Sequence, residues 1–210
     1  MNPILEKPMS IKLLLLLKLF FVTTLCLSGK SRLGEYYLGF GYGVLDQSDG
    51  FFEGESLNLL LNSPASESSD FNLDFSYLGL EANSSDETFL KLGLSYRHHF
   101  DQFYKNQGMV RPFVGLGLQY FKDTANLMIE EDGFGWSLDA GTELVFTRNF
   151  TFLFQGRLYG LWKDFAHNEF DLNSEFTWWF DEEHALSLGH LYSVDSGVNH
   201  FQLKYFYSWR

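Results

Sequence analysis

Cysteine and proline are almost absent from this sequence, with one cysteine and four prolines among 210 residues. A single cysteine excludes an intramolecular disulfide framework. Basic residues are also few, since 15 Lys and Arg stand against 27 Asp and Glu and leave a net charge of −12. This charge repels phosphate, which excludes nucleic acid as a partner. The mean hydropathy is only −0.13, so the chain is not a bundle of membrane helices.

Aromatic side chains, by contrast, are abundant. They make up 19% of the residues, with 23 Phe, 11 Tyr and 5 Trp. This much apolar surface excludes an intrinsically disordered chain. A length of 210 residues suits one domain or two small ones. High aromatic content at modest overall hydropathy is unusual, and it calls for an architecture that explains both.

The N-terminus has the three parts of a secretory signal peptide. Lys7 and Lys12 precede an apolar run of about 15 residues, and small residues follow this run. We predict that residues 1–29 are a signal peptide and that residues 30–210 form one exported domain. A chain that carries such a signal enters an extracytoplasmic compartment.

Two alternatives to a cleaved signal peptide exist at this terminus. The first is a permanent anchor helix, but the apolar run is short for a membrane span and Lys18 interrupts it. The second is a lipoprotein signal with acylation at Cys26, where Leu25 occupies the position at which such a signal needs a small side chain. Both are weaker interpretations than cleavage.

From residue 35 onward, apolar residues alternate with polar or small ones. Phe134, Trp136 and Leu138, for example, alternate with Ser137 and Asp139. A period of two indicates a β-strand with one apolar face. Turn residues separate the segments, so the sequence predicts an all-β domain of ten strands, with eight as the alternative. The predicted strands are 35–45, 54–62, 70–82, 88–100, 110–121, 134–146, 150–162, 169–180, 184–194 and 199–209.

The second face of these strands carries glycines and charges. Gly39, Gly41 and Gly43 form one small-residue stripe. In the narrow interior of a closed barrel, glycine leaves room and opposite charges pair. We therefore predict a lumen ion network, with Asp74 as a further anion. Its members are Lys91, Arg97, Arg111, Asp139, Glu143, Arg157, Asp171, Glu175 and Lys204.

Alternation alone does not say whether the apolar face points into a core or into lipid. Soluble strands average about 5–6 residues, whereas a tilted membrane strand needs about 9–11, and the predicted segments match the longer class. Aromatic residues gather near both ends of the segments, as in the two girdles of a membrane barrel. The sequence thus predicts a closed, antiparallel, up-and-down transmembrane β-barrel. A soluble secreted β-barrel that binds a small ligand is the alternative.

Three stretches carry a family resemblance. Residues 37–43 read Tyr-Leu-Gly-Phe-Gly-Tyr-Gly, residues 111–118 read Arg-Pro-Phe-Val-Gly-Leu-Gly-Leu, and an aromatic strand ends the chain. Together they resemble small outer-membrane β-barrel proteins of Gram-negative bacteria, the family of the OmpA transmembrane domain and the opacity porin-like proteins. In that family the barrel-assembly machinery recognises the last strand. The resemblance thus implies an assembly signal at Phe201, Leu203, Tyr205, Tyr207 and Trp209, although Arg210 follows the final aromatic residue.

The resemblance also implies topology, because both termini of these barrels are periplasmic and the strand number is even. Residues 147–149 and 181–183 then form short periplasmic turns, and residues 62–70 and 101–109 form longer periplasmic connections. The expected extracellular loops are 46–53, 83–87, 122–133, 163–168 and 195–198.

His190 and Ser193 are weak catalytic candidates. Their segment resembles the His-x-Ser-Asn signature of the outer-membrane lipid A deacylases, in which both side chains share one face of a strand. The spacing here is His-x-x-Ser, which places them on opposite faces unless a bulge intervenes. Asp164 with His167 resembles the Asp–His pair of omptin proteases, but the further acidic residues on long loops are missing.

The other titratable clusters have ordinary interpretations. His98 and His99 are adjacent, so they face opposite sides of a strand and do not chelate together; we interpret them as rim residues. The acidic run at 130–132 could attract divalent cations, but a solvated loop explains it. No pattern indicates a cofactor or a metal site.

These observations predict an integral outer-membrane protein with a non-catalytic role, either structural, in surface interactions, or as a narrow porin-like barrel. The lumen of such a small barrel is expected to be plugged by its internal ion pairs. The expected partners are outer-membrane lipid and lipopolysaccharide, and the barrel-assembly machinery during biogenesis, with the protein itself a monomer. A lipid A-modifying, deacylase-like enzyme is the alternative.

Overall fold

The computed structural model describes residues 30–48, 52–82, 85–101, 110–124, 128–129, 131–147 and 149–209. The predicted signal peptide at 1–29 and most of the expected connection at 101–109 lie outside the described residues. Within the described ranges, no helix is long and apolar enough to cross a membrane. The strands are β1 (Tyr36–Gln47), β2 (Glu53–Ser66), β3 (Ser69–Ala82), β4 (Ser85–His99), β5 (Val110–Asp123), β6 (Gly133–Val145), β7 (Phe150–Leu161), β8 (Asp164–Trp179), β9 (His184–Ser193) and β10 (Val198–Trp209).

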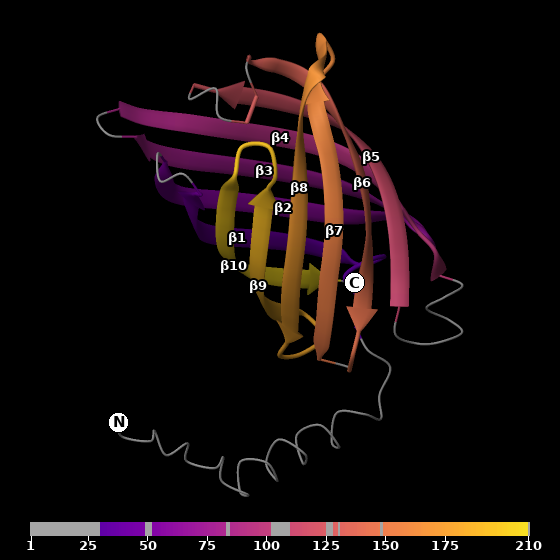
Figure 1. Cartoon of the computed structure of the whole chain (residues 1–210). Coiled ribbons are helices and arrows are strands. Elements are labelled where there is room, and N and C mark those ends of the chain that lie inside the picture. Colours follow the sequence, from indigo (N-terminus) through magenta and orange to yellow (C-terminus); the bar gives the residue numbers. More distant parts are fainter. Residues whose placement is uncertain are drawn as a thin grey trace, which may run out of the picture.

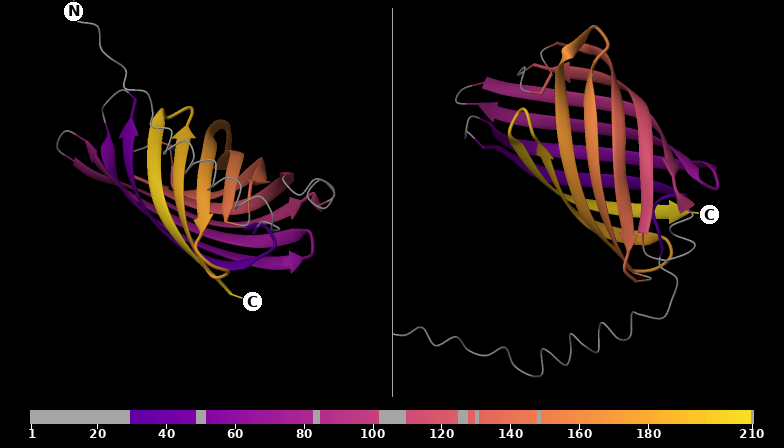
Figure 2. Two further views of the ribbon diagram at one scale, coloured as in Figure 1. Left: turned by 90° about the horizontal axis from the view of Figure 1, so that it is seen from below. Right: turned by 45° about the vertical axis from the view of Figure 1, so that its right-hand side comes forward.

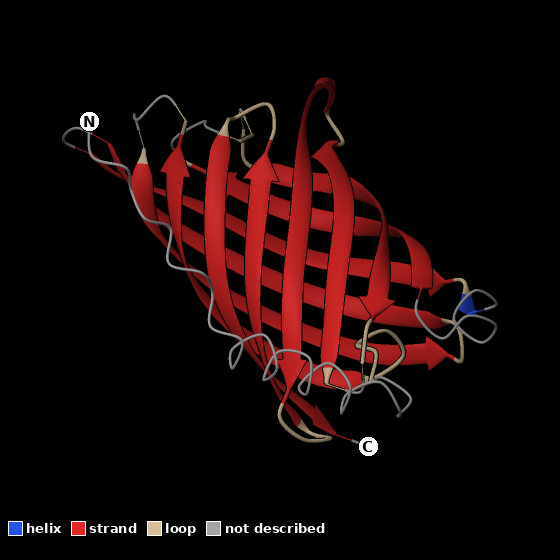
Figure 3. Ribbon diagram, turned by 60° about the horizontal axis from the view of Figure 1, so that its bottom comes forward, coloured by secondary structure: helices blue, strands red, loops and turns tan. Residues whose placement is uncertain are grey.

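The strands form one closed barrel. Each strand pairs antiparallel with its neighbours in sequence, and β1 pairs with β10 to close the sheet, from Tyr36 opposite Trp209 to Gln47 opposite Val198 (Figures 1 and 2). The strands are tilted, so that those of the near wall cross those of the far wall (Figure 3). The predicted ten-stranded, antiparallel, up-and-down barrel is confirmed.

The beginning of β1 and the end of β10 lie at the same end of the barrel, which we call the terminal end. The turns from β2 to β3, β6 to β7 and β8 to β9 also lie there. We call the opposite end, where β1 is connected to β2 and β9 to β10, the far end. Every interior side chain can be placed between these two ends by its position along its strand.

The outer surface is apolar and the interior is polar. Leu116 and Leu118 on β5 are each 60% exposed, whereas Asp139, Glu143 and Glu175 are at most 4% exposed. A water-soluble barrel has the opposite arrangement, with its apolar side chains inside. The chain is therefore a transmembrane β-barrel whose outer face contacts lipid, and the predicted assignment of the two faces is confirmed.

Aromatic side chains form clusters at both rims of the outer surface. At the far end, Phe134 contacts Tyr120 with ring centroids 5.3 Å apart, and Trp136 stacks on Phe165 at 6.0 Å. At the terminal end, other pairs occur, such as Trp178 with Phe180 at 4.5 Å and Tyr36 with Trp209 at 6.1 Å. Tyr and Trp favour the membrane–water interface because one part of the ring is apolar and the other is polar. These two clusters mark the two edges of the apolar band.

Two expected loops are mostly strand. β2 continues to Ser66 and β3 begins at Ser69, so the expected connection at 62–70 is wrong. β8 begins at Asp164, so the expected loop at 163–168 is wrong as well. The register of each hairpin shifts near its end, between Pro64 and Ser66 in the first. Alternation arises only where one strand face contacts lipid, so the sequence pattern does not reveal strand pairing beyond the apolar band.

Glycine on β1 is required where β1 approaches β10. A Cβ atom at Gly43 would lie 2.5 Å from the carbonyl oxygen of Phe201 and 2.7 Å from Nε2 of His200. The carbonyl oxygen belongs to the backbone of a paired strand, so it cannot move away without disturbing the hydrogen-bond ladder. At Gly79 on β3, by contrast, a Cβ atom would meet its nearest neighbour, Cε1 of Tyr77, at 4.0 Å.

We therefore expect Gly43→Ala to lower the free energy of unfolding by about 1–3 kcal/mol, the usual cost of overpacking. Gly79→Ala is the matched control and should change it much less, because the added methyl group meets no close neighbour. Denaturant titration of the refolded barrels in detergent measures both. Equal losses in the two variants would contradict the role assigned to the β1–β10 contact.

Candidate functional site in the barrel interior

An apolar cluster closes the interior at the far end. Phe121 on β5 is fully buried and stacks between Phe89 on β4, with ring centroids 6.3 Å apart, and Tyr159 on β7, at 5.4 Å. Aliphatic side chains surround this stack. The buried members of the cluster, which we call the far-end cluster, are Leu45, Leu78, Leu80, Phe89, Phe121, Ile129, Tyr159, Leu161 and Val198. These side chains pack against one another across this end of the lumen.

Part of the β5–β6 connection folds into the far end. Ile129 is 4% exposed and belongs to the far-end cluster, and Met128 packs against it. The carboxylate of Asp123 accepts hydrogen bonds from the backbone N–H groups of Met128, at 2.8 Å, and Ile129, at 3.1 Å. Asp123 is itself 3% exposed, so a buried carboxylate at the end of β5 holds Met128 and Ile129 against the far-end cluster.

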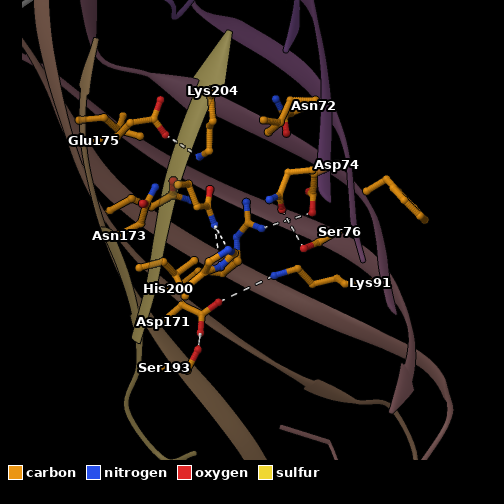
Figure 4. A pocket seen from close by; sticks show the side chains of 18 of the residues that line it. Asn72, Asp74, Ser76, Lys91, Asp171, Asn173, Glu175, Ser193, His200 and Lys204 are labelled. Atoms are coloured by element: carbon orange, nitrogen blue, oxygen red, sulfur yellow. Dashed lines mark hydrogen bonds and ion pairs between the residues drawn. The ribbon is translucent and has the colours of Figure 1, made fainter. Parts of the chain in front are cut away.

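Ion pairs connect opposite walls in the middle of the lumen. Lys91 on β4 pairs with Asp171 on β8 at 3.8 Å, and Arg157 on β7 pairs with Asp74 on β3 at 3.6 Å. These pairs surround a polar cavity of about 120 Å³, which has room for a few water molecules (Figure 4). Charges in such an interior are tolerated only when they are paired. The pairs therefore cross-link strands on opposite sides of the barrel.

Two further ion pairs lie closer to the terminal end. Nζ of Lys204 on β10 lies 2.7 Å from the carboxylate of Glu175 on β8 (Figure 4), and Glu175 also accepts a hydrogen bond from Ser187 at 2.7 Å. Arg97 on β4 pairs with Asp139 on β6 at 3.4 Å. The interior thus carries both signs of charge from the middle of the lumen to the terminal end.

A charged group surrounds His99 at the terminal end. His99 is fully buried and lies 2.9 Å from Asp101 and 3.6 Å from Asp70, and Nε of Arg111 donates to Asp101 at 2.7 Å. Burial opposes the charged form of Asp101, but the hydrogen bonds from Arg111 and His99 outweigh it and hold the pKa of Asp101 below its ordinary value. Asp101 therefore stays ionised, as a fixed partner for Arg111.

The residues before β1 enter this end of the lumen. Ser31, Arg32 and Leu33 are between 4% and 7% exposed, although they belong to no strand. Leu33 packs against Phe113 and Leu153, and Arg32 pairs with Glu175. Both ends of the lumen are therefore occupied by side chains, with a small polar cavity between them.

The structure brings together most of the residues that were predicted to form the lumen ion network. Lys91 pairs with Asp171, Arg97 with Asp139, and Lys204 with Glu175. Arg157 and Arg111 lie in the lumen as well, with Asp74 and Asp101 as their respective partners. Glu143 is fully buried on β6, where it contacts Ser31 and Arg32.

His190 and Ser193 lie on opposite faces of β9. His190 faces outward, where its ring packs on Phe201 at 4.6 Å, while Ser193 faces the lumen and donates to Asp171 at 2.7 Å. The two side chains do not form a nucleophile–base pair. The five residues of the proposed assembly signal, in contrast, share the outer face of β10, where Phe201 is 56% and Leu203 51% exposed.

A different serine and histidine meet inside the lumen. Oγ of Ser56 lies 2.5 Å from Nε2 of His200, and the amide of Gln202 donates to Nδ1 of the same ring at 2.7 Å. If Nδ1 accepts this hydrogen bond, then Nε2 carries the proton and cannot remove one from Ser56. The pair is therefore arranged for structural hydrogen bonding. In the described part of the chain, no group of three or more His, Cys, Asp or Glu side chains is placed to hold a metal ion.

Comparison with known proteins gives likenesses of fold. No protein-family model and no curated protein matches the sequence. Among solved structures, the KdgM porin has a TM-score of 0.45 at 11% identity, covering 83% of this chain and 99% of that one. An outer-membrane channel of Pseudomonas putida F1 has a TM-score of 0.49 at 8% identity, covering 87% and 98%. Neisserial surface protein A has a TM-score of 0.39 at 15% identity, covering 84% and 97%.

The sequence interpretation missed several interior residues. Arg32 and Asp70 were not assigned to the lumen, and His99 was assigned to the rim, although all three are buried there. The alternation along β4 could have revealed His99, since it shares a strand face with Lys91 and Arg97. For Arg32 no such signal exists, because it precedes the first strand and no period applies to it.

Proposed function

We propose that this chain is an integral outer-membrane protein with a non-catalytic role, and that the barrel is closed as folded. Its contribution is then structural or lies in surface interactions, and any passage of solutes is slow and narrow. The observation that carries the proposal is the far-end cluster, in which Phe89, Phe121 and Tyr159 stack across the lumen and Ile129 covers them. A diffusion pore needs a continuous aqueous path, and packed aromatic rings interrupt it.

The remaining parts of the proposal concern location and partners. The signal peptide directs the chain to the periplasm, both termini remain on that side, and the far end faces the exterior. The aromatic row on β10, which includes Phe201, Tyr205 and Trp209, serves as the assembly signal. Lipid and lipopolysaccharide contact the apolar outer face, and the protein is a monomer.

The geometry does not favour the deacylase alternative. An acyl-transfer site needs a serine within hydrogen-bond reach of a histidine base. His190 and Ser193 point to opposite sides of the wall, and the Ser56–His200 pair is buried in the lumen with an amide rather than a carboxylate behind the histidine. Neither arrangement offers a nucleophile to a lipid on the outer face.

Conductance in planar lipid bilayers tests the proposal. We expect the refolded, heat-modifiable protein to insert without forming a steady channel, because the far-end cluster and the residues before β1 occupy both ends of the lumen. A general-diffusion porin recorded in the same bilayers is the positive control. A stable open channel of porin size would overturn the closed-barrel function.

A further inference from the structure

At the terminal end of the lumen, Glu143, Arg111 and Asp70 are arranged around the backbone of residues 30–34. We call this part of the lumen the terminal mouth. Glu143 on β6 accepts hydrogen bonds from the hydroxyl of Ser31 and from the backbone N–H of Arg32, the latter at 3.0 Å. Arg111 on β5 donates to Oγ of Ser31, at 2.9 Å, and to the carbonyl oxygen of Leu33. A carboxylate thus accepts a backbone N–H group of the segment, and a guanidinium donates to one of its carbonyl oxygens, so the wall binds the backbone of the segment through charge-assisted hydrogen bonds.

Asp70 continues this recognition on β3. Its carboxylate accepts the N–H of Gly34 at 3.0 and 3.2 Å, and it lies 3.6 Å from the ring of His99. Gly34 has φ of +82°, and a Cβ atom there would lie 3.2 Å from the guanidinium of Arg111. The left-handed backbone favours glycine at this position, and a Cβ atom would also have to displace the guanidinium slightly. Gly34, at the end of the segment, therefore lies next to both Asp70 on β3 and Arg111 on β5.

Side chains of the segment also occupy defined places. The guanidinium of Arg32 pairs with Glu175 and lies 4.7 Å from the ring centre of Phe206. Leu33 fills an apolar pocket between Phe113 and Leu153. Nζ of Lys30 lies 4.2 Å above the ring of Trp179 at the rim. The segment is thus bound through its backbone, one arginine, one leucine and one lysine.

Glu143 in the barrel wall is hydrogen-bonded by the segment at residues 30–34. It is fully buried, and its hydrogen bonds among the described residues come from Ser31 and Arg32. A buried carboxylate that loses its donors is costly, whereas Glu175 would keep Lys204 and Ser187 if Arg32 left. The buried carboxylate of Glu143 thus receives its hydrogen bonds from the segment, while Arg111 stands opposite it in the β5–β6 register.

We propose that the terminal mouth is a peptide-binding site, occupied in cis by residues 30–34, and that this segment is a displaceable stopper of the lumen. The site takes a peptide with arginine at the position of Arg32, followed by a turn with glycine at the position of Gly34. The inference concerns the terminal end alone and holds whether or not the far end is closed.

Thiol labelling of the folded full chain measures the docking. In a Cys26→Ser background, Ser31→Cys places a thiol in the buried segment, and Ser66→Cys places one at the exposed β2–β3 turn. With a membrane-impermeant maleimide in detergent, the thiol at position 31 should react at least about tenfold more slowly than the thiol at position 66, because labelling requires local opening. Heat-modifiable gel migration confirms that each variant is folded.

Charge reversal then releases the stopper. Adding Arg32→Glu opposes Glu175 and Glu143 and should raise the labelling rate at position 31 at least about tenfold. Lys122→Glu makes the same charge change on the exposed outer face of β5 and should leave the rate unchanged. If the thiol at position 31 reacts as fast as the one at position 66, or if Arg32→Glu has no effect, the docked segment is refuted.

A peptide added in trans tests whether the mouth is a binding site. A fluorescein-labelled Lys-Ser-Arg-Leu-Gly-Glu peptide should bind the Arg32→Glu barrel saturably by anisotropy, and replacing its arginine with glutamate should weaken binding at least about tenfold. Absence of binding would refute the site. These readouts are independent of conductance, since a conducting wild-type protein would defeat the closed-barrel function while leaving protection at position 31 intact.

Discussion

Glu175→Ala should lower the free energy of unfolding by about 3–5 kcal/mol, the usual cost of breaking a buried ion pair from one side. Glu175 is 2% exposed and is the shared anion for Lys204, at 2.7 Å, and for Arg32. Its removal leaves two cations in the lumen without this counter-ion, and the low-dielectric interior makes that loss far larger than it would be in water. Denaturant titration of the refolded protein, followed by gel migration and tryptophan fluorescence, gives the change.

Lys163→Ala is the control for this prediction. It removes an ion pair with Glu131 at the far end, but these two side chains are 52% and 65% exposed. A pair in solvent contributes no more than about 1 kcal/mol, so the loss should be small. Comparable losses in the two variants would mean that the lumen is hydrated enough to solvate its charges, and the interpretation of the ion pairs as structural cross-links would fall.

Phe121→Ala should also lower the free energy of unfolding by about 3–5 kcal/mol, since truncating a buried phenylalanine loses its transfer free energy and leaves a cavity. Phe121 is fully buried and stacks on both Phe89 and Tyr159, which stand on neighbouring or near-neighbouring strands. The wall around it is a closed sheet and cannot collapse into the gap, which places the expected cost at the upper part of the range for core truncations.

Phe134→Ala provides the comparison on the same hairpin. Phe134 begins β6 on the outer face and is 73% exposed, so its truncation opens no cavity and removes only surface contacts, such as that with Tyr120. We expect a clearly smaller loss by the same titration. If Phe134→Ala costs as much as Phe121→Ala, the far-end cluster is not the packed stopper that the closed-barrel function requires.

Much of the wall was predictable, because a barrel wall is a local pattern. A strand that separates lipid from an interior must alternate, so residues such as Leu138 and Asp139 reveal their faces from sequence alone. The same alternation assigned Lys91, Arg97 and Glu175 to the lumen. Where the strands pass beyond the apolar band, as at Ser66 and Asp164, alternation stops while backbone pairing continues, and there the predicted boundaries were wrong.

The contacts inside the lumen were not predictable in the same way. The alternation places Lys91 and Asp171 on interior faces. Their pairing, however, depends on the relative stagger of β4 and β8, which lie four strands apart in the barrel. Residues 30–34 and 128–129 carry no period at all, and both enter the lumen because buried anions, Glu143 and Asp123, accept their backbone N–H groups.

Scarce cysteine, few basic residues and abundant aromatics, read with the alternation, were enough to predict a transmembrane barrel of ten strands, with eight as the alternative, and an aromatic outer face. The aromatic residues inside the lumen, such as Phe121, were not predicted. The predicted properties follow from the environment on each side of the wall, which is lipid outside and a polar lumen inside. Each strand residue faces one or the other according to its place in the alternation. The packing of side chains across both ends of the lumen was decided only by tertiary structure. This packing depends on residues 30–34 and 128–129, which lie outside the strands and contact the buried carboxylates of Glu143 and Asp123. No pattern along the chain reveals that these segments and carboxylates come together in the fold.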